Sequence, residues 1–514
     1  MVGENFAVKI YTCALQYDYQ TPWKAPTISR WTGSGFVIDG KRIITNAHVA
    51  GGAVFLEVQL ANDSVKYPAT LKAVSHECDL AELTVDNEEF WQKTAALPIG
   101  ETPQRKQKVE VHGFPIGGEG YCITDGIVSR LENDMYVHGE QILLSTQVSA
   151  PINPGNSGGA VLSEGKVVGV VHQGINRSQS IGYMIPASVL KHFIEQVRTN
   201  NMGFPTLGIE CQNMENPFLR EQYQMDKTQT GILVRDIPDL SCVKGKLQEG
   251  DVILKINGIQ IWNDGTVHLD PMKHIDYRYL INNSLLGSEV EFEILRDGKK
   301  LVEKATLTNS LGSMQVIAPL SFGKPPTYFI IGGGIVVQPV SKNFVNDTQK
   351  SYGNKQKGKP HEQLVAINTI LKSEYTQGYD DFNGELIAKV NDKEIMHIRD
   401  VIDAIQNNQG KFHKIQTQSG KMIVLPRLST KLRQDLLKAY QINSDRSSDL
   451  SQYAKSEPQL PAIASSSQPI LFSKASQRKP RKYRHTKSVH NVDQHLVAEL
   501  TDSLSRVRIQ GKHL

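Results

Sequence analysis

Three short segments carry a histidine, an aspartate and a serine of the kind that acyl-transfer chemistry uses. His48 follows the letters TNA, Asp79 lies in CDLAEL, and Ser157 lies in PGNSGGAV. A serine hydroxyl is a weak nucleophile until an imidazole takes its proton, and the imidazole needs a carboxylate that fixes its tautomer. Each residue alone could be structural. Together they predict a catalytic triad with His48 as general base, Asp79 as its orienting acid and Ser157 as nucleophile.

The glycines around the serine predict an oxyanion hole. Glycine lets the backbone turn freely, so the N–H groups of Gly155 and Ser157 can point at the oxygen that becomes negative in a tetrahedral intermediate. The approach to the serine, TQVSAPINPGN, contains no acidic residue. A pocket built from this approach and from residues 171–174 is expected to be apolar, which predicts cleavage after small or medium aliphatic residues.

The remaining candidate groups predict no cofactor and no metal. The five cysteines are odd in number and widely spaced, which fits neither a disulfide framework nor a zinc site and favours a reducing compartment. Cys78 is expected to be a small buried thiol. Other histidines of this region show no metal-ligand spacing and are expected to be structural or surface residues: His76, His112, His138 and His172. No glycine-rich phosphate loop with an adjacent lysine is present, so ATP dependence is not expected.

The elements that must position the triad indicate an all-β domain over residues 1–200. Short β-rich segments such as GSGFVI, RIITNAHV, KVEVHGF and KVVGVVHQG are separated by turn residues as far as about residue 185. Residues 186–199 then place apolar side chains at helical spacing after a proline that suits a helix start. We expect this helix to close the domain.

A weak internal repeat follows the β domain. DVILKINGIQI at 251–261 aligns with ELIAKVNDKEI at 385–395, with four identical positions. Each copy predicts a strand, a tight turn, a helix at 275–283 or 398–406, and further strands. We therefore expect two related α+β modules, at 201–310 and 311–430.

The last part of the chain, 431–514, is expected to be a short helix followed by a disordered basic tail. Beyond residue 447 the sequence is rich in Ser, Gln and Pro, so burial cannot offset the entropy of ordering it. Residues 478–487, RKPRKYRHTK, hold six Lys or Arg. This run is either a solvated tail or a patch for nuclear targeting or for an anionic surface.

Two further features bear on location. Glu4 and Lys9 interrupt any apolar run near the start, and no small-residue cleavage pattern follows, so a secretory signal is not expected. The longest apolar stretch, at 328–340, contains three consecutive glycines and is too short to span a bilayer. We expect a cytoplasmic protein without a membrane span. Signal-independent export, or nuclear targeting by the basic run, would leave no such mark.

Several motifs resemble those of the HtrA/Deg family of serine proteases, most of all its plant-type Deg branch and bacterial relatives. They are GSGFVIDGKRIITNAHV, HECDLAELTVDNEEFW, GFPIGG, GIVSR, YVHG and INPGNSGGAV. The resemblance covers about residues 5–450. It implies a chymotrypsin-like double β-barrel that carries the triad, followed by two PDZ-type modules. It also implies a homotrimer, or a multiple of trimers, that acts on unfolded or damaged proteins.

The two modules differ in how well they match the PDZ pattern. TLGIE at 206–210 resembles the family's carboxylate-binding loop, so Leu207, Gly208 and Ile209 are expected to bind the C-terminus of a peptide that adds as a strand. The alternative is that these residues only open a core strand. In the second module, GGGIVVQPVS at 332–341 has no clear counterpart of that loop. An assembly or regulatory role is therefore expected there.

Three functions remain to be separated. The intact triad predicts an ATP-independent serine endopeptidase of protein quality control, with no nucleic-acid partner. The alternative is a non-proteolytic chaperone or PDZ adaptor that keeps the protease fold. A third possibility is a processing protease whose basic tail directs it to one anionic partner.

Overall fold

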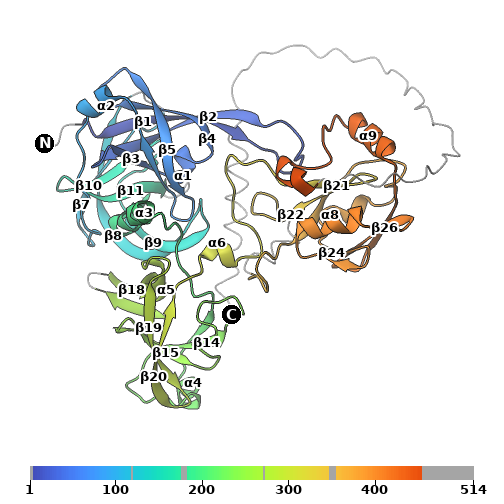
Figure 1. Ribbon diagram of the computed structural model, residues 1–514. Helices are drawn as coiled ribbons and strands as arrows, with labels where there is room; N and C mark the ends of the chain where they lie inside the picture. Colours follow the sequence, from blue (N-terminus) through green and yellow to red (C-terminus); the bar gives the residue numbers. More distant parts are fainter. Residues whose placement is uncertain (1–3, 117–119, 175–181, 270–271, 346–354, 454–514) are drawn as a thin grey trace, which may run out of the picture. The chain divides into compact units, whose positions relative to one another are not determined.

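The computed structural model describes residues 4–116, 120–174, 182–269, 272–345 and 355–453 (Figure 1). Residues up to 460 belong to one compact unit. The second unit, 461–514, lies outside the described residues. The disordered basic tail that the sequence predicts lies outside them from residue 454 onward.

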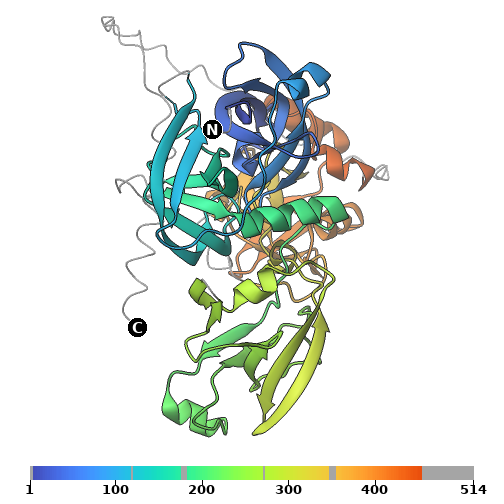
Figure 2. The ribbon, with the colours of Figure 1, turned by 90° about the vertical axis from the view of Figure 1, so that its left-hand side faces the viewer.

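Two closed β-barrels of six strands occupy residues 7–186 (Figures 1 and 2). The first barrel runs in the order β1-β2-β3-β6-β5-β4 and consists of β1 (Ala7–Gln16), β2 (Thr27–Ile38), β3 (Arg42–Thr45), β4 (Ala53–Leu60), β5 (Lys66–Ser75) and β6 (Leu80–Thr84). The second runs in the order β10-β11-β12-β9-β8-β7 and consists of β7 (Lys108–Gly113), β8 (Cys122–Tyr136), β9 (Gln141–Val148), β10 (Ala160–Ser163), β11 (Lys166–Gly174) and β12 (Gly182–Pro186). The predicted all-β double barrel is confirmed.

Alternating apolar residues fill both barrels. In a small barrel every second side chain of a strand points inward, and β-branched residues fit that pleated surface. The first core includes Val8, Ile10, Ile43, Leu56, Val58 and Leu83. The second core includes Val109, Val111, Val128, Val148, Val161 and Met184. Closure leaves no unpaired strand edge in either barrel, so the connections between strands are held at defined places.

The helix α3 (Ala187–Thr199) follows the second barrel, as the sequence predicts. It begins after Pro186 and ends at Asn200, whose φ of 50° is left-handed and stops the helix. Its buried face, which includes Leu190 and Phe193, packs against β11 and β12 (Figure 2). Two shorter helices follow strands of the first barrel. They are α1 (Ala47–Ala50), after β3, and α2 (Glu88–Gln92), after β6.

The first module contains the sheet β13-β14-β15-β19-β20, with β16 paired to β15, and a separate hairpin β17-β18. Its strands are β13 (Glu210–Asn213), β14 (Ile232–Asp236), β15 (Val252–Ile256), β16 (Ile259–Gln260), β17 (Thr266–Leu269), β18 (Met272–Asp276), β19 (Glu289–Arg296) and β20 (Lys299–Thr306). Its helices are α4 (Pro217–Gln222) and α5 (Arg278–Asn282), and α6 (Leu311–Met314) follows. The helix predicted at 275–283 is therefore shorter than expected, because β18 takes its first residues.

The second module has two sheets, β21-β22-β23 and β25-β24-β26-β27. Its strands are β21 (Phe329–Ile331), β22 (Ile335–Pro339), β23 (Val365–Ile370), β24 (Ile387–Val390), β25 (Lys393–Glu394), β26 (Phe412–Thr417) and β27 (Met422–Pro426). Its helices are α8 (Ile398–Gln406), α9 (Thr430–Ala439) and the short 3₁₀ turns η1 (Asp380–Phe382) and η2 (Ser448–Tyr453). The predicted helix at 398–406 is confirmed. Across the described residues, none of the helices has the length and apolar character needed to cross a membrane.

Candidate active site

His48 lies in α1, the single helical turn that follows β3. Its ring Nδ1 lies 2.7 Å from Oδ2 of Asp79, and its backbone N–H donates to Oδ1 of the same carboxylate over 2.8 Å. The amide of Asn46, just before α1, donates to the backbone carbonyl of Asp79 over 2.9 Å. These three contacts join α1 to the start of β6. They leave Nε2 of His48 free to accept a proton.

Asp79 lies in the connection between β5 and β6, and its side chain is fully buried. Its φ of 54° places the backbone in the left-handed region, which aspartate tolerates better than most residues with a Cβ atom. The turn directs the carboxylate at α1 rather than along the strand. Local backbone geometry therefore contributes to the contact with His48.

The electrostatics of the pair favour an ionised acid and a basic imidazole. Burial raises the pKa of Asp79, but attraction to His48 and hydrogen bonds from His172 and His48 lower it more, so the net pKa lies well below the usual range. Burial lowers the pKa of His48, but attraction to Asp79 and their hydrogen bond raise it more, so the net pKa is above the usual value. The pair can therefore hold a proton on His48 after it leaves a neighbouring group.

Ser157 lies in the loop between β9 and β10, and both barrels hold this loop in place. The hydroxyl of Ser34, on β2, donates to the carbonyl of Gly155 over 2.7 Å, and its backbone N–H donates to the carbonyl of Ser157 over 2.9 Å. From the second barrel, the carbonyl of Val171 accepts from the N–H of Gly158 over 3.0 Å. The nucleophile predicted from sequence thus lies on a loop that is fixed from two sides.

Two glycines of this loop have conformations and surroundings that exclude a side chain. Gly155 has a φ of 97°, and a Cβ there would come within 2.5 Å of the carbonyl oxygen of Phe114. Gly158 has a φ of 84°, and a Cβ there would lie 2.3 Å from the carbonyl oxygen of Ser34. Within the described residues, neither the N–H of Gly155 nor that of Ser157 has an acceptor. Both predicted oxyanion donors are therefore available to a ligand.

The structure brings His48 and Asp79 together but does not join His48 to Ser157 directly. Among the described residues, no hydrogen bond connects the imidazole to the serine hydroxyl. Such bonds are often long in ligand-free enzymes and tighten when substrate arrives. The structure thus contains a formed pair of His48 and Asp79, together with a serine loop that is held by hydrogen bonds.

Sequence reasoning missed a group of histidines around Asp79. Nε2 of His172 lies 3.3 Å from Oδ2 of Asp79, and Nε2 of His138 lies 3.9 Å from Oδ1. His138 in turn lies 2.8 Å from Nδ1 of His76. These three were expected to be structural or surface residues, yet they come from three separate connections and strands. One sequence signal was available for His172. It follows Val171 on β11, and β11 pairs with β10, the strand that follows Ser157.

His112 and Cys78 do not join this group as reacting residues. His112 contacts the hydroxyl of Tyr121 and Glu110 instead. Cys78 is fully buried, and burial raises the pKa of its thiol to about 12. The expectation of a small buried thiol is confirmed. Within the described residues, no cluster of three or more His, Cys, Asp or Glu is arranged to hold a metal ion.

The predicted carboxylate-binding residues precede the edge strand β13 of the first module. Leu207 is buried, and its carbonyl accepts from the hydroxyl of Ser241 over 2.6 Å. Gly208 has a φ of 67°, and its N–H donates to Thr206 over 3.1 Å. Its carbonyl accepts from the amide of Gln356 over 2.9 Å. Gln356 thus binds the loop that the sequence predicts to receive a peptide C-terminus.

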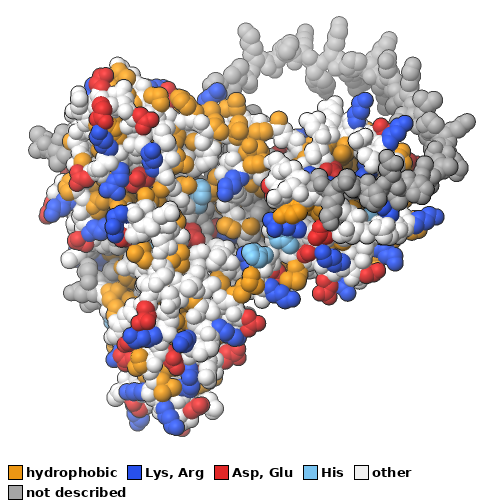
Figure 3. Space-filling model, in the orientation of Figure 1, with side chains coloured by type: hydrophobic (Ala, Val, Ile, Leu, Met, Phe, Trp, Pro, Cys, Tyr) orange, Lys and Arg blue, Asp and Glu red, His pale blue; other side chains and the backbone are white. Residues whose placement is uncertain are grey.

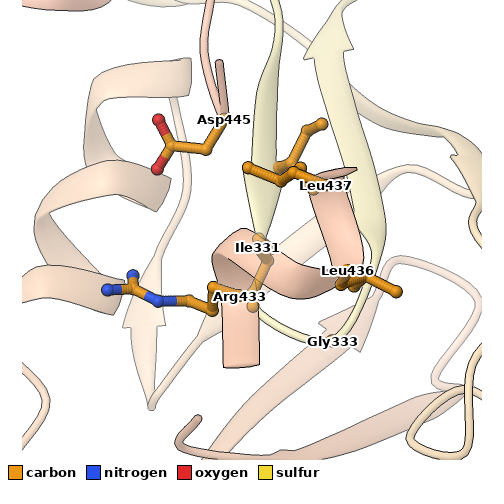
Figure 4. A pocket seen from close by; sticks show the side chains of 8 residues that line it. Ile331, Gly333, Arg433, Leu436, Leu437 and Asp445 are labelled. Atoms are coloured by element: carbon orange, nitrogen blue, oxygen red, sulfur yellow. The ribbon is translucent and has the colours of Figure 1, made fainter. Parts of the chain in front are cut away.

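In the second module, the glycine turn at 332–334 joins β21 to β22. Side chains of α9 lie over this turn, and a small pocket there is lined by residues of β21, α9 and the chain after it (Figure 4). The labelled lining residues are Ile331, Gly333, Arg433, Leu436, Leu437 and Asp445. The glycine turn and α9 therefore line the same pocket.

Two regions of the chain match known protein families. Residues 33–170 match the family described as trypsin-like peptidase domain, and residues 317–449 match the family described as PDZ domain. The second match includes α9, which lies past residue 430. The chain therefore has a trypsin-like peptidase region followed by a PDZ region.

Curated relatives match over most of the chain. The putative protease Do-like 3, mitochondrial, of Arabidopsis thaliana is 33% identical over 87% of this chain and 80% of its own length. Protease Do-like 4, mitochondrial, of the same plant is 35% identical over 82% of this chain and 80% of its own length. Among solved structures, the HtrA-type protease AlgW with decapeptide is 24% identical, with a TM-score of 0.45 over 60% of this chain and 96% of that chain.

These relatives show that the expected cytoplasmic location is wrong. Their names place them in mitochondria, and another relative, protease Do-like 2 of Arabidopsis thaliana, is chloroplastic. They point to an organellar location. The expectation rested on a missing secretory signal, whose apolar core is a different feature from the amphipathic, Arg- and Ser-rich segments that direct import into these organelles.

The same relatives decide between the broad functions. They are named proteases, which supports hydrolysis and not the alternative of a non-proteolytic chaperone or adaptor. Identity above 30% extends over most of both chains, and a peptidase region precedes a PDZ region. The chain therefore belongs to the HtrA/Deg family of serine proteases and is a serine endopeptidase with PDZ-type modules.

Proposed function

We propose that this endopeptidase cleaves unfolded or damaged proteins without ATP, through a triad of His48, Asp79 and Ser157. The observation that carries the triad is the double contact of Asp79 with the ring and backbone of His48, at 2.7 and 2.8 Å. A folded protein hides its backbone, whereas an unfolded segment can enter a cleft as an extended strand. Such a site is therefore suited to select substrates by how accessible their backbone is.

The proposed reaction uses the free Nε2 of His48. It accepts the proton of the Ser157 hydroxyl while Oγ attacks the carbonyl carbon of the substrate. The carbonyl oxygen becomes negative and accepts hydrogen bonds from the N–H groups of Gly155 and Ser157. His48 then gives the proton to the leaving amine, and the peptide bond breaks. Water repeats the sequence on the acyl-enzyme and restores the serine.

Active-site labelling tests this assignment directly. A fluorophosphonate probe should modify the wild-type protein at Ser157 and leave Ser157→Ala unmodified, with the labelled peptide identified by mass spectrometry. Heat-unfolded protein should not react, since the serine is activated only in the folded site. Labelling of Ser157→Ala at the wild-type rate would show that another residue is the nucleophile.

We also propose cleavage after Val, Ala, Ile or Leu. The approach to Ser157 has no acid, and Ile152 packs so closely on β12 that a Cβ at Gly182 would lie 2.4 Å from its Cδ1. An apolar wall of this kind disfavours a charged side chain without a partner. Sequencing the fragments of a denatured substrate tests the proposal, and a majority of cuts after Arg or Lys would contradict it.

For the first module, we propose that Leu207, Gly208 and Ile209 receive the free C-terminus of a peptide that adds beside β13. Gln356 already binds the carbonyl of Gly208, so its side chain lies against the loop that the peptide would enter. Gln356→Ala in the full chain should therefore strengthen binding of a peptide with an apolar last residue. The amidated form of that peptide is the control. Equal binding of acid and amide would show that the loop does not recognise a carboxylate.

Assembly into a homotrimer, or a multiple of trimers, is the last part of the proposal. Large apolar side chains are exposed on β2 and β4, namely Ile28, Val54 and Phe55. Hydrophobic side chains gather on the part of the surface where Figure 1 draws these strands (Figure 3). Contiguous exposed apolar surface is a common mark of contact between subunits.

A further inference from the structure

Asp79 is surrounded by more histidine rings than a catalytic triad requires. Oδ2 of Asp79 is approached by Nδ1 of His48 at 2.7 Å and by Nε2 of His172 at 3.3 Å. Nε2 of His138 is 3.9 Å from Oδ1, which is beyond hydrogen-bond range. Within the described part of the chain, His172 is therefore the one additional ring close enough to act on the carboxylate.

The surroundings of His172 define which of its nitrogens carries the proton. Nδ1 is buried, and it has no hydrogen-bond partner among the described residues. A proton there would be a buried donor without an acceptor, which is unfavourable. Nε2 faces the ionised Asp79 instead. The favoured tautomer thus has its hydrogen on Nε2, directed at Oδ2.

The fold holds this ring rigidly. The side chain of His172 is 2% exposed, and its ring packs against that of Tyr136, with 4.6 Å between the ring centroids. Tyr136 is itself fixed, because its hydroxyl donates to the carbonyl of Leu144 over 2.5 Å. The preceding residue on β11, Val171, accepts the hydrogen bond from Gly158 in the serine loop. One strand therefore supports both the acid and the loop of the nucleophile.

We propose that His172 is a positioning residue for hydrolysis, whose Nε2–H shares Oδ2 of Asp79 with His48 and fixes the rotation of the carboxylate. The proposal rests on the triad assignment made above. Among the described residues, no hydrogen bond joins His172 to Ser157. Its effect reaches the reaction through Asp79, which must face His48 with a fixed geometry in every turnover.

Other titratable groups face the same carboxylate and must be considered in any pH measurement. They are His48 on α1, His76 and Cys78 in the β5–β6 connection, and Tyr136 and His138 at the end of β8. Burial lowers the pKa of His138 to about 3, and burial also lowers the pKa of His76. Burial raises the pKa of Cys78 to about 12 and that of Tyr136 well above its usual value. Burial thus favours the neutral forms of His76, Cys78, Tyr136 and His138, and His48 is the neighbour whose protonation the pH profile follows.

The test compares two substitutions of similar size, His172→Gln and His172→Met. The glutamine amide can donate to Oδ2 from about the position of Nε2, whereas the methionine thioether cannot donate. Both remove the ring from Tyr136, so they share any loss of packing. His172→Met should lower kcat by about 10- to 100-fold, as expected for loss of a hydrogen bond to a charged group, with little change in KM. His172→Gln should restore most of kcat.

The pH profile gives a readout that a packing defect would not move. Loss of the donor leaves the negative charge of Asp79 less offset, which raises the pKa of His48. Activity needs neutral His48, so the acid side of the kcat/KM profile should shift to higher pH in His172→Met and stay in place in His172→Gln. His413→Met is the matched control, because His413 is a buried histidine on β26, in the second module. It should keep the kcat and pH profile of the wild type.

The possible outcomes separate this proposal from the triad assignment. Wild-type kcat and pH profile in folded His172→Met, or an equal loss in His172→Gln and His172→Met, would overturn the positioning role. If Ser157→Ala is inactive in the same assay, the triad stands in either case. Should His172→Met not fold, as judged by thermal unfolding, His172→Phe takes its place, since it keeps a ring against Tyr136 but has no donor.

Discussion

Single residues around Asp79 determine how the site can work. Its left-handed backbone, with φ of 54°, directs a fully buried carboxylate at α1. Burial of a charge is costly unless it is paired and hydrogen-bonded, and the ring and backbone of His48 supply both. The carboxylate is thus stabilised as an anion by His48, the residue that it orients in the proposed triad. This is the arrangement that a general base requires.

Removal of the nucleophile or of the base should abolish hydrolysis. Ser157→Ala removes the attacking oxygen and His48→Ala removes the proton acceptor, so each should lower kcat by a factor on the order of 10⁴ or more. The measurement is turnover of an unfolded protein, with thermal unfolding to confirm the fold. Ser64→Ala, which changes an exposed serine in the connection between β4 and β5, is the control. More than a tenth of wild-type activity in Ser157→Ala would contradict the assignment.

Activity should fall on acidification at an unusually high pH. The net pKa of His48 is raised, so the ring stays protonated to a higher pH than an ordinary histidine and cannot accept the serine proton. The acid side of the kcat/KM profile should therefore lie above about pH 6.5, the usual histidine value. In Asp79→Asn only burial remains, which lowers the pKa, so the residual activity should fall at a lower pH. A profile that Asp79→Asn does not shift would exclude this coupling.

Among the elements, the serine loop depends on the strands beside it. β2 supplies Ser34, which binds the loop at Gly155 and Ser157, and β11 supplies the carbonyl of Val171. Each strand belongs to a different barrel. The loop can therefore keep its shape only when both barrels are folded and in register.

Gly158→Ala should uncouple the loop from β2. The new Cβ would lie 2.3 Å from both the carbonyl oxygen of Ser34 and Oγ1 of Thr45, and the φ of 84° is unfavourable for alanine. We expect a large loss of kcat together with a lower melting temperature. Gly258→Ala is the control, because it has a similar φ of 77° with nothing within 4 Å of the added Cβ. It should lower stability by only about 1 kcal/mol and leave kcat unchanged. Wild-type activity in Gly158→Ala would show that the loop tolerates displacement.

The sequence predicts those elements that local chemistry determines. Asn257-Gly258 and Asn391-Asp392 have positive φ at both positions, as tight hairpin turns require, and both turns were predicted. The helix at 398–406 was predicted because its apolar residues recur at helical spacing and all face the core. In the first module the corresponding helix was predicted too long, since residues 272–276 pair with β17 instead.

The histidines near Asp79 could not be predicted in the same way. His76 follows β5, His138 follows β8, and His172 lies on β11. Only the closure and register of the two barrels bring these positions to one carboxylate. Spacing along the chain carries no sign of it, so a search for metal-ligand spacing treated them as unrelated residues. His48, Asp79 and Ser157 were found because their flanking motifs are distinctive.

At the scale of the whole molecule, the protease region is combined with modules that suit capture of peptides. The peptidase match at 33–170 and the PDZ match at 317–449 fall in separate parts of the chain. The apolar side chains exposed on β2 and β4 belong to the protease region.

Phe55→Glu should weaken assembly. Phe55 is 51% exposed on β4, and a charge there would have to be buried without a partner if this surface joins subunits. Light scattering coupled to size exclusion should give a trimer, or a multiple of it, for the wild type and a smaller mass for the variant. Val302→Glu, at a 59% exposed site on β20, is the control and should keep the wild-type mass. A monomeric wild type, or equal masses for all three proteins, would contradict the proposal.

Cys78 directly precedes Asp79, the proposed catalytic acid, and its buried thiol can report local opening of the structure around that acid. With no exposed surface and a pKa of about 12, it holds almost no reactive thiolate while the first barrel is closed. Alkylation of Cys78 under native conditions would therefore proceed only through transient openings of the β5–β6 connection. The rate of Cys78 alkylation, followed by mass spectrometry, would measure how often this connection opens when no substrate or active-site probe is bound.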